Sequence, residues 1–132
     1  MEVLEEHIAH HKHIHQLYQK AFDSFEGISL QVNPNDDFDS NFWLSTILID
    51  ENKTGVNYET LRVELDKRNI ETRPLWKPLH LQPVFSSAPA YVDGTSERLF
   101  HQGLCLPSGP CVSDEDVNFI VDSIAEIMGI RR

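Results

Sequence analysis

The sequence lacks several features that would mark a specialised protein class. Its 132 residues contain only two cysteines, Cys105 and Cys111, which is too few for a zinc site with four thiolate ligands. Its longest apolar runs, such as residues 44–49, are much shorter than the stretch of about 20 residues that spans a bilayer. Basic side chains are also scarce, because 11 lysines and arginines are outnumbered by 21 acidic residues, which leaves a net charge of −10. A protein that binds along nucleic-acid phosphates needs a basic face, so we expect no nucleic-acid partner. Because the apolar runs are too short to span a bilayer, we expect no membrane partner either.

The amino terminus also lacks a secretory signal, because no basic stretch precedes an apolar one. We therefore expect a cytoplasmic protein, in which the two cysteines are buried free thiols. A disulfide between them is geometrically conceivable, but a cytoplasmic protein lacks the oxidising setting that disulfides need. The length, with 40% hydrophobic and 24% charged residues, predicts one domain over residues 1–132.

Recognisable catalytic motifs are absent as well. The sequence has no glycine-rich phosphate loop, no G-x-S-x-G and no H-E-x-x-H. Neighbouring carboxylates, such as Glu5 with Glu6 and the run 114–116, fall at predicted helix starts, where solvent and the helix dipole account for them. Cys105 lies in an apolar segment, which disfavours a nucleophilic role. We therefore predict no catalytic residue in this chain alone.

Hydrophobic periodicity predicts an α+β fold. Helices are expected over residues 2–22, over 58–68 after a cap at Asn57, from 95 or 96 to 103, and after a capping box that begins at Ser113. Strands are expected at 28–32, 42–49, 70–73 and 104–107, with 42–49 in the middle of the sheet. This order implies a small, mostly antiparallel sheet that is covered on one face by helices.

The first predicted helix is unusual because His7, His11 and His15 share its apolar face. Such a face suits a helix that packs partly against another domain or subunit. Histidines at this spacing can also chelate a metal ion, but no acidic ligand joins them and Lys12 lies among them. A histidine-rich helix without a metal site is therefore favoured. Of the three alternatives for function that the sequence leaves open, a small metal-binding protein is the weakest.

The segment 71–83 combines a stiff backbone with several hydrogen-bonding and aromatic side chains. Its three prolines each fix one backbone torsion and remove a hydrogen-bond donor, so the segment is predicted to be extended. Its polar and aromatic side chains would then be presented at low entropic cost. The residues alone leave two alternatives equally open: a structural crossover in which Trp76 and Phe85 fill the core, or a binding loop within the long connection 74–94.

The familiar stretches of the sequence are residues 70–85 (IETRPLWKPLHLQPVF), residues 103–109 (GLCLPSG) followed by 113–117 (SDEDV), and the opening 1–8 (MEVLEEHI). In this order they resemble the carboxyl-terminal domain of the DegT/DnrJ/EryC1/StrS family of pyridoxal-phosphate-dependent sugar aminotransferases. The resemblance covers essentially the whole chain. It implies the small carboxyl-terminal domain of a fold-type I aminotransferase.

The resemblance also implies that the chemistry lies outside this chain. In that family the large domain carries the lysine that forms a Schiff base with pyridoxal phosphate and the aspartate that pairs with the cofactor's ring nitrogen. None of the five lysines, at positions 12, 20, 53, 67 and 77, lies in the corresponding serine-containing segment. The chain is therefore expected to be roughly the last third of an enzyme, to bind no cofactor by itself and to be inactive alone.

Substrate-binding residues are implied within the proline-rich segment. By resemblance, Arg73 would bind a phosphate through its forked guanidinium, and Trp76 would form a stacking wall. His80 would donate a hydrogen bond to a sugar or phosphate, and Gln82 would line or support the same pocket. The implied reaction moves an amino group, usually from glutamate, to a keto-sugar nucleotide in surface polysaccharide or antibiotic sugar synthesis. The family form is a homodimer, and the main alternative is a stand-alone module that dimerises and binds without catalysis.

Overall fold

The computed structural model describes residues 2–130, so Met1 of the family-like opening lies outside the described residues. The elements follow one another as α1 (Leu4–Phe22), β1 (Ile28–Leu30), β2 (Ser45–Ile49), α2 (Glu51–Thr54), α3 (Tyr58–Asp66), β3 (Arg73–Pro74), the 3₁₀ turns η1 (Leu79–Leu81) and η2 (Pro83–Phe85), α4 (Thr95–Gln102), β4 (Gly103–Leu106) and α5 (Asp114–Ile127). All the predicted helices and strands are present, and the short α2 is an addition to them.

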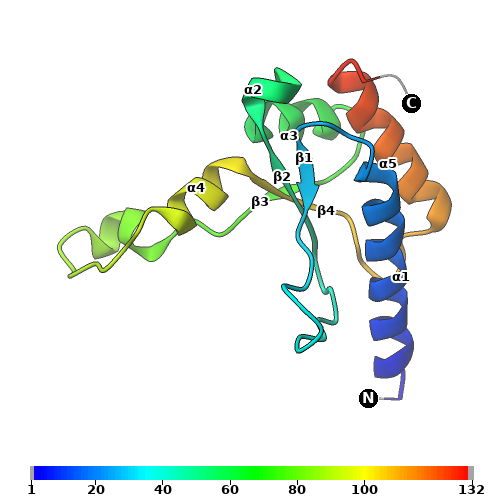
Figure 1. Cartoon of the computed structure of the whole chain (residues 1–132), viewed down its shortest axis with the longest axis horizontal. Helices are drawn as coiled ribbons and strands as arrows, with labels where there is room; N and C mark the ends of the chain where they lie inside the picture. The colour runs from blue at the N-terminus through cyan, green and yellow to red at the C-terminus, as the bar shows by residue number, and fades with distance from the viewer. Residues whose placement is uncertain (1, 131–132) are drawn as a thin grey trace.

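The strands form one antiparallel sheet in the order β1-β2-β4-β3. β2, the predicted central strand, lies between β1 and β4. The helices α1, α3 and α5 cover one face of this sheet and contact one another through α5 (Figure 1). The predicted α+β fold, with an antiparallel sheet and helices on one face, is confirmed.

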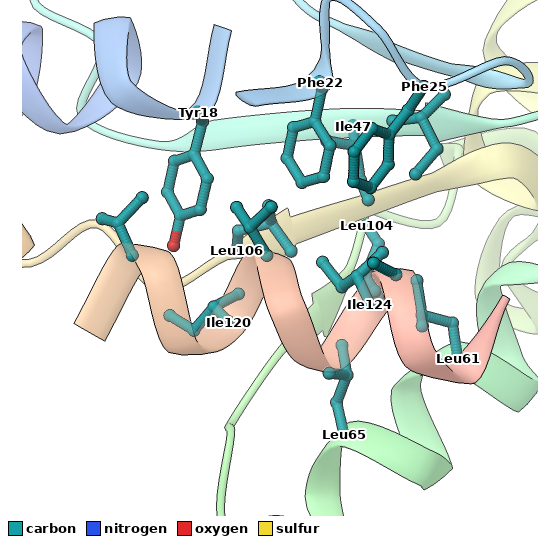
Figure 2. Close-up of a cluster of buried hydrophobic side chains, with 14 of the residues drawn as sticks. Tyr18, Phe22, Phe25, Ile47, Leu61, Leu65, Leu104, Leu106, Ile120 and Ile124 are labelled. Carbon is teal, nitrogen blue, oxygen red and sulfur yellow. The ribbon is translucent and has the colours of Figure 1, made fainter. Parts of the chain in front are cut away.

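The hydrophobic core lies between that face and the three helices. In β2 the buried residues Ser45, Ile47 and Ile49 alternate with less buried ones, as a strand with one face in the core requires. Figure 2 shows side chains of β2 and β4 meeting aromatic residues of α1 and aliphatic residues of α3 and α5. Tyr18 is fully buried in this cluster, and its hydroxyl donates to the carbonyl of Pro107 at 2.8 Å. The one polar atom of this large side chain is therefore satisfied, and it ties α1 to the loop after β4.

The predicted helix boundaries depend on capping side chains that the structure confirms. Ser113 and Asp116 form a capping box at the start of α5, and their hydrogen bonds lower the pKa of the Asp116 carboxyl. The Asn57 side chain accepts from the backbone N–H of Thr60 at 2.9 Å at the start of α3. Asn69, with a φ of +61°, adopts the left-handed conformation that was predicted to follow this helix.

The predicted strand 42–49 is wrong in its first three residues. Phe42 has a φ of +47° and Trp43 is 64% exposed, so β2 begins only after them. The cause is local hydrogen bonding, because the Ser40 hydroxyl accepts from the Phe42 N–H at 3.0 Å and the Asn41 side chain accepts from the Trp43 N–H at 3.1 Å. Short polar side chains that bond the backbone two residues further on compete with the strand ladder.

The predicted ends of other strands, and the predicted burial of the cysteines, need smaller corrections. The strands β1 and β3 are shorter than predicted, and β3 ends at Pro74, which has no N–H to extend the ladder. Cys105 is buried as predicted, but Cys111 is an exposed free thiol, because it lies in the turn before α5 and not in the core.

Residues 75–102 form an arm that projects away from the sheet and the helices (Figure 1). The arm runs outward through η1 and η2, which order part of the predicted loop 74–94, and returns along α4 into β4. Every residue from 83 to 98 is exposed. This part of the chain therefore owes its position to its two ends and not to a core of its own.

The amino-terminal half of α1 is also open to solvent. Leu4 is 48% exposed, and the first fully buried side chain of the helix is Ile14. The expectation that part of this apolar face lacks a partner within the chain is therefore confirmed for the residues that the structure describes. Across residues 2–130, no helix has the length and hydropathy that a membrane crossing requires.

Candidate functional site

A cavity of about 1080 Å³ lies where the β3–β4 side of the sheet meets the loop before β2 and the start of α5. Its walls come from segments that are far apart in the sequence. The lining residues that matter for its chemistry are Trp43, Arg73, Trp76, Lys77, Phe119 and Asp116. The proline-rich segment 71–83 therefore contributes one wall of this cavity.

Both tryptophans of the chain stand together at this cavity. Their ring centroids are 6.5 Å apart, the rings are tilted by 42°, and Trp43 and Trp76 are 64% and 70% exposed. The alternative in which Trp76 and Phe85 fill the core is wrong, because Phe85 is also 40% exposed. Two exposed indoles at a concave surface offer a planar or apolar ligand a stacking surface.

The cationic wall of the cavity is partly neutralised from within the chain. The Arg73 Nε donates to the Glu71 carboxylate at 2.8 Å, and both side chains are more than 70% exposed. An ion pair this exposed contributes only about 0–1 kcal/mol, so a phosphate could displace Glu71 at low cost. Lys77 adds a second cation to the lining, whereas the ionised Asp116 adds a negative charge.

The other two predicted residues, His80 and Gln82, are outside the cavity lining and lie in the arm. The His80 Nε2 lies 4.0 Å from a carboxylate oxygen of Glu97 in α4, which is beyond hydrogen-bond distance, so the two side chains are neighbours across the arm. The Gln82 side chain donates to the carbonyl of Lys77 at 2.9 Å and holds the turn around η1. His80 and Gln82 therefore belong to the arm, whereas Arg73 and Trp76 line the cavity.

Sequence reasoning missed Trp43 and Phe119 as cavity residues. Trp43 was assigned to a buried strand, although the preceding Ser40 and Asn41 are the type of residue that bends a backbone out of a strand. Phe119 was outside the apolar stripe used to predict α5, and it is 55% exposed on the cavity side. The sequence did contain a signal for Phe119, because this aromatic residue lies off the apolar, core-facing side of its predicted helix.

The histidine-rich helix does not assemble a metal centre among residues 2–130. The described residues contain no group of three His, Cys, Asp or Glu side chains that could hold a metal ion. His13 instead pairs with Asp114 of α5 at 2.7 Å, and His15 packs its ring on Phe42.

Cys105 is the one buried thiol, and its surroundings oppose nucleophilic chemistry. Burial raises its pKa, and its sulfur lies 3.8 Å from the Thr46 hydroxyl. A thiol whose pKa is raised is mostly protonated at neutral pH and is a weak nucleophile.

The described lysines do not form a site for pyridoxal phosphate. Such a site needs an enclosed amine for the Schiff base. Lys12, Lys53 and Lys67 instead form surface ion pairs with Asp39, Glu26 and Glu64. Lys20 and Lys77 are exposed, and although Lys77 lines the cavity, nothing encloses its amine. No reaction step is therefore assigned to a cofactor on these residues.

Comparison with known sequences identifies relatives along nearly the whole chain. The sequence profile of the DegT/DnrJ/EryC1/StrS aminotransferase family matches residues 1–125. EpsN of Bacillus subtilis (strain 168) is 31% identical over an alignment of 131 residues, which covers 96% of this chain and 33% of that protein. The GDP-perosamine synthase of Escherichia coli O157:H7 is 31% identical over 126 residues, with the same two coverages. The chain thus spans about a third of the length of these relatives.

Solved structures agree with this result at the level of the fold. The aminotransferase TlmJ from Streptoalloteichus hindustanus superposes with a TM-score of 0.84 at 20% identity, over 97% of this chain and 33% of that one. S. venezuelae DesV, solved in complex with a ketimine intermediate, gives a TM-score of 0.83 at 24% identity, over 99% of this chain and 34% of that one. With the family profile covering residues 1–125, the chain belongs to the DegT/DnrJ/EryC1/StrS aminotransferase family, whose members depend on pyridoxal phosphate.

Proposed function

We propose that this chain is the small, substrate-side domain of a sugar aminotransferase that transfers an amino group, usually from glutamate, to a keto-sugar nucleotide. The names of relatives support a nucleotide-linked sugar, since three are GDP-perosamine synthases and a structural neighbour, DesI, was solved with its TDP-sugar product. A further relative, SpsC of Bacillus subtilis, is named for spore coat polysaccharide biosynthesis. This supports a role in making surface sugars.

The observation that carries the proposal is the cavity in which an arginine and two tryptophans converge. A nucleotide-sugar combines a planar base, a pyrophosphate and a sugar ring. The Trp43–Trp76 pair offers a stacking surface for one of the rings, and the Arg73 guanidinium can bind a phosphate through two parallel hydrogen bonds. His80 and Gln82 lie in the arm, outside the cavity lining, and by the family resemblance they would contact the sugar or support its pocket.

The catalytic part of the proposal is that the Schiff-base lysine lies in a large domain outside these 132 residues. The exposed, mostly paired lysines described above support this assignment. The exposed apolar start of α1 supports a neighbouring domain or a second subunit at that face, as in a homodimeric enzyme. The chain by itself would bind substrate without turning it over.

The test is a titration of the chain with a GDP-linked hexose and, in parallel, a TDP-linked hexose, read by tryptophan emission. Because both tryptophans line the cavity, binding should change the emission in a saturable way. Arg73→Ala should weaken binding about tenfold, as expected for the loss of a charge-assisted contact of about 1.5–3 kcal/mol. Trp76→Ala should also weaken binding, whereas Arg98→Ala, on the exposed part of α4, is the matched control and should leave it unchanged.

Two outcomes would contradict the proposal. One is a chain that shows no saturable response to either nucleotide-sugar at millimolar concentration. The other is binding that is indifferent to Arg73 and Trp76. A stable dimer of the chain without nucleotide-sugar binding would instead favour the stand-alone interaction module.

A further inference from the structure

The loop between β1 and β2, residues 31–44, is fastened to α1 by two side chains. Lys12 forms an ion pair with Asp39 at 2.5 Å, on the exposed surface. One turn along the helix, the ring of His15 stacks on the ring of Phe42, with centroids 3.7 Å apart and planes within 15° of each other. His15 is only 2% exposed, so the stack is the buried member of the two contacts.

Phe42 needs an external contact to keep its conformation. Its φ of +47° lies in the left-handed region, which a side chain with a β-carbon disfavours. The hydrogen bonds that the side chains of Ser40 and Asn41 accept from the backbone help to form this bend. On its far side, the carbonyl of Trp43 accepts a hydrogen bond from the buried Ser108 hydroxyl at 3.2 Å. The bend therefore directs two successive aromatic residues to different places, Phe42 onto α1 and Trp43 to the cavity.

The imidazole of His15 contributes to this arrangement through its ring face and not through its nitrogens. Neither Nδ1 nor Nε2 has a hydrogen-bond partner among the described residues, although both atoms are buried. A neutral imidazole must carry one N–H, and burying that donor without an acceptor is unfavourable. The favourable contact that the structure shows for this ring is the stack on Phe42.

We propose that His15 is a positioning residue whose ring, stacked on Phe42, holds Trp43 against Trp76 and thereby sets the aromatic wall of the cavity. His15 is not itself among the residues that line the cavity. The inference goes beyond the proposed function, because it concerns the shape of the cavity whatever ligand enters it.

The experiment uses the fact that the chain has only two tryptophans, both in this wall. The electronic transitions of two indoles with centroids 6.5 Å apart couple, which gives a paired band in circular dichroism. His15→Ala should remove most of this coupled band and make tryptophan emission easier to quench with acrylamide. His15→Phe keeps a flat ring against Phe42 and should retain the wild-type band.

The matched control is Phe22→Leu, a buried change on the same helix whose ring contacts are with Tyr18 and Phe25 and not with the loop. It should lower stability while leaving the coupled band intact, which separates positioning from general loosening. If His15→Ala does not fold, Phe42→Ala removes the same stack from the loop side and should lose the band. A wild-type band in the folded His15→Ala or Phe42→Ala variant, or its loss in His15→Phe, would overturn the inference.

Discussion

At the scale of single residues, the cavity is built from side chains with weak internal ties. Within residues 2–130, the Arg73 guanidinium pairs with an exposed carboxylate, that of Glu71, and the two indoles keep most of their surface in water. A guanidinium and indoles with such weak internal contacts can still form hydrogen bonds to a ligand or stack on it. The buried Tyr18 hydroxyl, by contrast, has its hydrogen bond within the fold.

His15 predicts a pH dependence of stability at this scale. Burial lowers its pKa below the ordinary value of 6.5, so the unfolded chain binds a proton more readily than the folded one. Where the unfolded state binds more protons, stability rises with pH. The free energy of unfolding should therefore fall as the pH drops below 6.5, by up to about 1.4 kcal/mol for each unit of pKa depression.

Urea unfolding at pH 7.5 and at pH 5.5 measures this effect. The His15→Phe variant cannot take up the proton, so the difference between the two pH values should shrink in that variant. An equal difference in the wild type and in His15→Phe would show that other groups cause it.

At the scale of elements, the arm depends on one glycine where it rejoins the sheet. A β-carbon added at Gly103, the first residue of β4, would lie 2.1 Å from the Leu75 Cδ1 and 2.8 Å from the carbonyl oxygen of Leu99. The absence of a side chain therefore lets both ends of the arm pack against the strand. This close packing at Gly103 is one of the contacts that join the arm to the sheet, along with that of Phe100 near Tyr58.

Gly103→Ala should accordingly destabilise the chain by about 1–3 kcal/mol, as overpacking of a buried site does. It should also raise protease cleavage within residues 83–98. Gly109→Ala is the matched control, because its added β-carbon would meet nothing within 4 Å. Equal stability and equal cleavage in the two variants would contradict this role of Gly103. Denaturant unfolding and limited proteolysis provide the two measurements.

The elements also show what the sequence could and could not predict. Helix boundaries were predictable because caps are local, as Asn57 and Ser113 demonstrate. The start of β2 was not, because the apolar run at 42–44 favours a strand while side chains of the residues before it bend the backbone. The pairing of Trp43 with Trp76 depends on tertiary structure, and no sequence spacing encodes it.

Composition left the role of the proline-rich segment open and family resemblance implied a substrate-binding one; two of its four predicted residues, Arg73 and Trp76, line the cavity. The other two, His80 and Gln82, are in an arm whose direction depends on its junction with the sheet. The resemblance therefore pointed to a segment that contributes to the cavity wall, but it did not separate the residues that line the cavity from those in the arm.

At the scale of the whole molecule, the chain spans about a third of the length of its relatives and leaves the start of α1 exposed. The account predicts that it has no specific amine for pyridoxal phosphate. After incubation with the cofactor and borohydride reduction, peptide mass spectrometry should find low labelling spread over several exposed lysines. Saturable labelling of one lysine, with an absorption band typical of a Schiff base, would contradict the assignment of the catalytic lysine to a separate domain.

The central claim is that the cavity between β3, the loop before β2 and α5 binds a nucleotide-sugar. The two indole N–H signals in a ¹⁵N–¹H NMR spectrum of the labelled chain report on it most directly, because each tryptophan gives one signal and both line the cavity. The account predicts that a GDP- or TDP-linked hexose shifts both signals to saturation, and that Arg73→Ala weakens this response about tenfold. Indole signals that stay in place while either ligand is raised to millimolar concentration would contradict it.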